Sequence, residues 1–67
     1  MTKTEAVNAL FEGKKLTHIL FTNEEWIENK EGLLVDEKGM KLDRTIFWIN
    51  RTSTKWSTGW FIYNLKQ

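Results

Sequence analysis

Residues 2–18, which read TKTEAVNALFEGKKLTH, decide the fold because a helix ends and a strand begins within them. Thr2 and Glu5 have the spacing of a capping box, which predicts that a helix starts at Thr2. Gly13 favours a left-handed cap at the helix C-terminus. Between these ends the apolar residues recur one turn apart, at Ala6, Val7, Leu10 and Phe11. The stretch therefore predicts a short amphipathic helix that leads directly into the next element.

The period of the pattern changes to two after the helix. In residues 16–21 both alternating sets of positions are mostly apolar, which predicts a strand buried on both faces. Residues 22–29 leave two alternatives open. Thr22 could cap a helical turn, whereas Trp26 between charged neighbours suits a short strand, which we favour.

Glycine-closed turns at residues 30–32 and 37–39 separate the remaining β segments, which are residues 33–35, 45–51 and 60–65. Taken together, the elements predict an α+β fold with one N-terminal helix packed on an antiparallel sheet of four or five strands. A length of 67 residues allows one small domain over residues 1–67.

The composition excludes several classes of site. The chain has no cysteine and one histidine, so it offers no disulfide, no thiol nucleophile and no cysteine zinc cage. No apolar run approaches the roughly 18 residues that span a bilayer, and no secretion signal is evident, so we expect a cytoplasmic protein without membrane partners. Four tryptophans are more than so short a chain readily buries alone, which predicts a homo-oligomer.

No residue pattern points to catalysis, to a metal or to a cofactor. His18 lies among apolar neighbours, which predicts a core or edge histidine with one hydrogen bond. Glu24, Glu25 and Glu28 lack the spacing and glycine turn of a calcium loop, so we expect them on a solvated face. The interpretation is a non-catalytic protein that acts by binding.

Charge is unevenly distributed along the chain. Seven acids against three lysines lie between residues 24 and 43, whereas residues 44–67 hold four bases and no acid. This last third also interleaves aromatic rings with hydroxyl groups, which is typical of a site for a nucleotide-like ligand. Trp56 or Trp60 would stack on the base, and Arg51 and Lys55 would meet phosphate. The candidate ligand residues are Arg51, Lys55, Trp56, Trp60, Thr52, Ser53, Ser57, Thr58, Lys14 and Lys15.

Two interpretations of the Trp56 side chain stay open. Trp56 either folds back to close the core, which we favour, or is exposed to a partner.

In the alternative function, the protein is an acidic inhibitor that binds a host enzyme through Glu24, Glu25, Glu28, Glu31, Asp36 and Glu37. Single-stranded nucleic acid on an aromatic sheet face is a further alternative, whereas a net charge of +1 disfavours sequence-specific duplex DNA.

Both ends of the chain resemble a pattern in small bacteriophage proteins. The residues that carry the resemblance are Glu5-Ala6, Ala9-Leu10, the run from Glu12 to His18, Trp56 and the run from Gly59 to Tyr63. The pattern is similar to the second class of Thoeris anti-defence proteins, which sequester cyclic ADP-ribose-like signalling nucleotides. The resemblance implies a counter-defence protein in the cytoplasm of a bacterial host. The chain departs from the pattern at Gly59, where an acidic residue often precedes the tryptophan.

Overall fold

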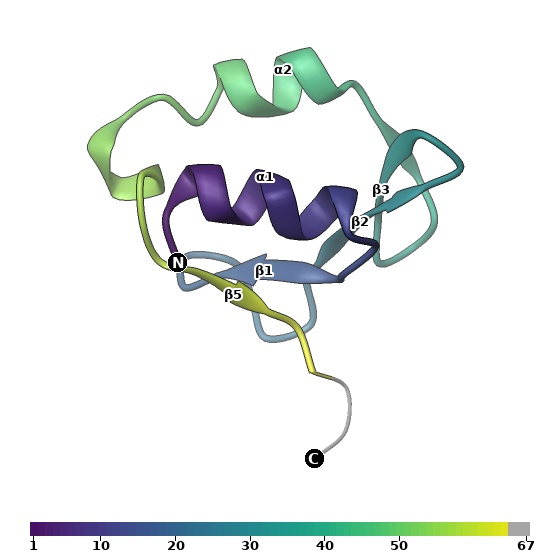
Figure 1. The fold of residues 1–67 in the computed structure, drawn as a ribbon, viewed down its shortest axis with the longest axis horizontal. Helices are drawn as coiled ribbons and strands as arrows, with labels where there is room; N and C mark the ends of the chain where they lie inside the picture. The colour runs from purple at the N-terminus through teal and green to yellow at the C-terminus, as the bar shows by residue number, and fades with distance from the viewer. Residues whose placement is uncertain (65–67) are drawn as a thin grey trace.

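The computed structural model describes residues 1–64, and it has the predicted α+β fold. In chain order the elements are α1 (Lys3–Phe11), β1 (Leu16–His18), β2 (Ile27–Lys30), β3 (Leu33–Asp36), β4 (Lys41–Leu42), α2 (Arg44–Ile49), the 3-10 turn η1 (Thr54–Trp56) and β5 (Trp60–Ile62). The strands form one antiparallel sheet in the order β4-β3-β2-β1-β5. Both helices lie on the same side of it (Figure 1). Of the predicted strand over 60–65, residue 65 lies outside the described residues.

The N-terminal helix begins and ends as its sequence predicts. Thr2 Oγ1 accepts a hydrogen bond from the Glu5 amide at 3.2 Å, and Glu5 Oε1 accepts one from the Thr2 amide at 2.8 Å. Gly13, just past the helix, has the positive φ of a left-handed cap. The predicted apolar face is wrong at Phe11, which is 70% exposed. Phe11 lies farther round the helix than the buried side chains, which are Ala6, Ala9 and Leu10.

The first strand is shorter than predicted but is buried as expected. All three of its residues are buried, and Leu16 lies between Ile27 of β2 and Ile62 of β5. The chain turns after His18, so Ile19 and Leu20 are exposed rather than part of the strand. The predicted burial on both faces therefore holds for residues 16–18 but not for residues 19 and 20.

The ambiguous stretch over residues 22–29 contains parts of both alternatives. A turn closes where the Thr22 amide donates to Glu25 Oε1 at 2.7 Å, and the favoured strand follows as β2. Gly32 and Gly39 both have positive φ, which confirms the two predicted turns. The edge strand β4 was not predicted, because its two residues are too short a signal.

The prediction of a strand over residues 45–51 is wrong, because the chain forms α2 there. Asp43 caps this helix by accepting the Ile46 amide at 3.0 Å. One turn of helix points Phe47 into the core and leaves Ile46 and Ile49 exposed. β-forming residue types describe a fit to a pleated surface, and a local cap with one buried side chain outweighs them here.

Trp60 is the centre of an aromatic core. Its side chain is 1% exposed, and its indole N–H donates to the Trp56 carbonyl at 2.7 Å. Trp56 is half-buried and packs against this core, as the favoured interpretation predicts. The rings left most exposed are phenylalanines, Phe11 and Phe61, rather than indoles. Within residues 1–64 no helix has the length and apolar character needed to cross a membrane.

Candidate functional site

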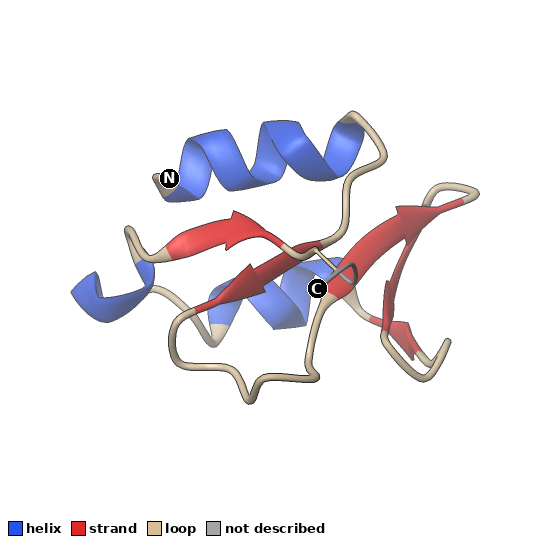
Figure 2. Ribbon diagram, turned by 90° about the horizontal axis from the view of Figure 1, so that it is seen from below, coloured by secondary structure: helices blue, strands red, loops and turns tan. Residues whose placement is uncertain are grey.

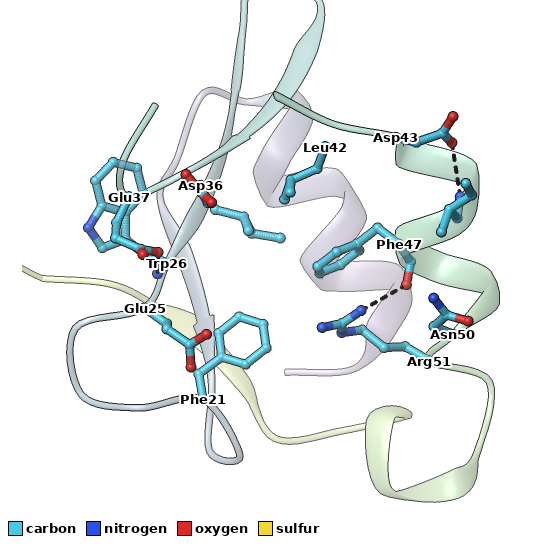
Figure 3. Close-up of a pocket in the computed structure, with 12 residues that line it drawn as sticks. Phe21, Glu25, Trp26, Asp36, Glu37, Leu42, Asp43, Phe47, Asn50 and Arg51 are labelled. Atoms are coloured by element: carbon cyan, nitrogen blue, oxygen red, sulfur yellow. Dashed lines mark hydrogen bonds between the residues drawn. The ribbon is translucent and has the colours of Figure 1, made fainter. Parts of the chain in front are cut away.

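A cleft of about 310 Å³ lies between α2 and the inner side of β2 and β3 (Figure 3). Its apolar walls are formed by Phe21, Ile27, Leu42, Ile46 and Phe47, whereas the ring of Trp26, which also borders the cleft, points away from it (Figure 3). Its polar groups belong to Glu25, Asp36, Glu37, Asp43, Asn50 and Arg51. A concave site with apolar walls and a few convergent polar groups is the usual form of a ligand site, so this cleft is the strongest candidate.

Arg51 supplies the positive charge of the cleft. It follows α2 directly, where its amide donates to the Trp48 carbonyl at 3.0 Å. Its Cζ lies 3.9 Å from the centroid of the Phe47 ring and 4.9 Å from that of Trp56. Nη1 donates to the Phe47 carbonyl at 3.1 Å, whereas the buried Nε has no acceptor among the described residues. Burial lowers the pKa of Arg51 from its ordinary value, and the charge of Glu25 opposes this shift.

Four carboxylates surround the same cleft, and local structure positions each of them. Each accepts a backbone N–H through one oxygen: Glu25 from Thr22, Asp36 from Lys38 and Met40, Glu37 from Trp26, and Asp43 from Ile46. Among residues 1–64 the second oxygen of each carboxylate accepts no such bond. The four side chains are therefore held by the fold and still present an acceptor.

The charge of the cleft decides which ligands it favours. Four carboxylates and one guanidinium give a formal charge of −4 + 1 = −3. This charge attracts cations and repels a phosphate group. The aromatic walls favour a flat cation, because a guanidinium stacks on ring faces and pairs with carboxylates. The described residues contain no group of three or more His, Asp or Glu arranged to hold a metal ion.

Most predicted ligand residues lie away from this cleft. Arg51 lines it, and Trp56 contacts Arg51 from behind. Trp60 was a candidate stacking residue, but burial in the core leaves its ring no open face. Lys14 and Lys15 do not line the cleft; the Lys15 Nζ is 4.9 Å from the centroid of the Trp26 ring, and Lys14 lies near α1 with Glu12. The structure does not bring these side chains together.

The hydroxyl-rich loop folds on itself instead of facing the cleft. The Ser57 hydroxyl donates to the Thr54 carbonyl at 2.7 Å within η1. The Ser57 carbonyl accepts the Lys3 amide, and the Thr58 carbonyl is 2.7 Å from the His18 Nε2. Five predicted residues on this loop are exposed and lie outside the cleft beside α2: Thr52, Ser53, Lys55, Ser57 and Thr58.

His18 is the core residue that its neighbours predict. It is 1% exposed, and its Nδ1 accepts the Leu20 amide at 3.0 Å. Nε2 must then carry the proton, which it donates to the Thr58 carbonyl. Both ring nitrogens are used inside the fold.

The acidic interpretation fits the cleft better than the nucleotide interpretation does. Of its six carboxylates, three line the cleft: Glu25, Asp36 and Glu37. The others, Glu24, Glu28 and Glu31, lie outside it. Asp43, Phe47 and Asn50 were not predicted for the site, because these residues meet only when residues 44–49 are helical. The signal for that helix is Asp43, a residue type that favours the N-cap position.

Comparison with protein-family models, with curated proteins and with solved structures finds no match to this chain.

Proposed function

We propose that the protein acts by binding, and that the cleft beside α2 receives a positively charged group of a partner protein. The observation that supports this proposal is the charge of the cleft, where four carboxylates surround aromatic walls. An arginine side chain fits this chemistry, since its guanidinium stacks on rings and pairs with carboxylates. A basic surface of a host enzyme is the partner that the acidic interpretation implies.

The test is a titration with a short arginine-rich peptide, followed by calorimetry. Glu37→Gln keeps an oxygen that accepts the Trp26 amide but removes one charge from the cleft. We expect this variant to bind about fivefold more weakly, since one partly exposed ion pair contributes about 1 kcal/mol. Glu24→Gln removes the same charge outside the cleft and is the matched control. Equal affinity of the two variants, or no binding by the natural sequence, contradicts the proposal.

A nucleotide-like ligand is the second candidate, and the buried Nε of Arg51 without an acceptor favours it. Its base would lie between the aromatic walls, while its phosphates would remain outside the acidic rim. A counter-defence role in a bacterial cytoplasm is what the resemblance of the chain ends adds to this candidate. Titration of adenosine and of ATP separates the two candidates. The negative charge of the cleft predicts that ATP binds more weakly than adenosine, whereas tighter binding of ATP than of adenosine favours the nucleotide candidate.

Self-association is also part of the proposal. Ile49 is 62% exposed on α2 and lies outside the cleft, so a second copy would cover it there. Sedimentation of the natural sequence at rising concentration is expected to show a larger species that Ile49→Gln weakens. A monomer at every concentration overturns this part without affecting the cleft.

A further inference from the structure

The face of the sheet opposite the helices is a second surface. Side chains alternate along strands, and Leu16 and Ile27 face the helices, so their neighbours face the other way. Thr17 pairs with Phe61 on this outer face. Figure 2 is seen from this side, and no helix lies in front of β1 and β5.

Three aromatic rings surround the centre of the outer face. Phe61 is 50% exposed, while Tyr63 and Trp26 are half-buried. The Trp26 and Tyr63 ring centroids are 6.0 Å apart, and Lys15 lies over Trp26. Rings in this arrangement offer flat faces beside a cation.

An open cleft of about 560 Å³ adjoins these rings. Thr17 of β1, Phe61 of β5 and Tyr63 line it. Thr22 and Asn23, from the loop after β1, line it as well. Among residues 1–64 no Asp, Glu, Lys or Arg lines this cleft. Thr22, Asn23 and Tyr63 offer it hydroxyl and amide groups that can pair with the edge of a base, whereas the Thr17 hydroxyl already donates to the Glu25 carbonyl.

The outer face also carries the opposite charge from the cleft beside α2. The strand registers place Lys30, Lys41 and Glu28 on it, and Lys15 lies there over the Trp26 ring. Three positive charges and one negative charge give +2, against −3 for the other cleft. The near-neutral total of the sequence conceals this separation.

We propose that the outer face binds a single-stranded nucleic acid. Unpaired bases stack on exposed aromatic rings, hydroxyl and amide groups contact their edges, and lysines neutralise phosphates. A flat sheet face does not enter a duplex groove, so the strand must be single. This activity goes beyond the proposed function and uses the other side of the protein.

The test is the fluorescence anisotropy of a labelled oligothymidylate of about eight nucleotides, measured at several salt concentrations. Phe61→Ala is expected to weaken binding about fivefold or more, since stacking of one base is lost. Lys15→Gln is expected to reduce the salt slope by about 0.7, because one phosphate contact disappears.

Two matched control variants distinguish binding at the outer face from non-specific binding. Phe11→Ala removes an even more exposed ring from α1, and Lys55→Gln removes a lysine from the loop at η1. Both are expected to bind as the natural sequence does. Absence of binding at low salt, equal binding of duplex DNA, or equal loss in the control variants overturns the proposal. The arginine-peptide titration is unaffected by each of these outcomes.

Discussion

Gly59 is the glycine at which an added methyl group is expected to lower the free energy of unfolding most. Its φ is +92°, and a Cβ there would lie 2.9 Å from His18 Nε2 and 3.1 Å from Ile19 Cγ2. His18 cannot move aside easily, because it is buried and its Nε2 donates to the Thr58 carbonyl. The left-handed backbone costs about 1–2 kcal/mol for a residue with a side chain. The steric overlap adds about 1–3 kcal/mol.

Gly59→Ala is therefore expected to lower the free energy of unfolding by about 2–5 kcal/mol. A domain of this size has only about 3–10 kcal/mol in total, so the variant is expected to be near its unfolding limit. Gly39→Ala is the matched control, since its φ is +80° but nothing lies within 4 Å of its Cβ. Thermal and urea unfolding of both variants, followed by circular dichroism, measures the difference. The reasoning is refuted if Gly59→Ala is no less stable than Gly39→Ala.

Three further outcomes follow from the packing. Leu10→Ala empties a core position that is 1% exposed and is expected to cost about 2–5 kcal/mol in urea unfolding, whereas a cost below about 1 kcal/mol would contradict its place in the core. Asp43→Ala removes the cap of α2 and is expected to lower the free energy of unfolding by about 1 kcal/mol, whereas Asp43→Asn keeps the cap. An equal loss in both variants would show that the charge of Asp43, not its capping hydrogen bond, matters. Arg51→Lys removes a planar group stacked on Phe47 and is expected to lower the unfolding free energy by about 1 kcal/mol; no change in the melting temperature would contradict this stacking.

The parts of the fold that the sequence predicts correctly are those set by local chemistry. The capping box at Thr2 and Glu5 and the glycine turns at Gly32 and Gly39 each fix their own backbone. They can be identified from neighbouring residues, without knowledge of the tertiary fold.

The prediction fails where tertiary contacts choose between two local structures. Residues 44–49 are rich in β-formers, yet the cap at Asp43 and the burial of Phe47 make them helical. This one error also displaced the predicted site. With α2 in place, Arg51 points into an acidic cleft rather than toward Lys55 and the hydroxyl-rich loop.

The distribution of charge shows the same limit. Reading along the chain separates an acidic middle from a basic end, whereas the folded sheet separates an acidic side from a basic side. Glu28 and Glu37 belong to the same acidic stretch of sequence, but Glu37 lines the cleft and Glu28 faces outward. Only the folded structure reveals which side each carboxylate occupies.

The most direct test of the central claim is an amide-shift map recorded while N-acetyl-arginine amide is added to the protein. The account predicts that the largest shifts occur at Phe47 on α2, at its caps Asp43 and Asn50, and at Asp36 on β3, which border the acidic cleft. Shifts confined to the outer face around Phe61, or no saturable shifts at all, would contradict it.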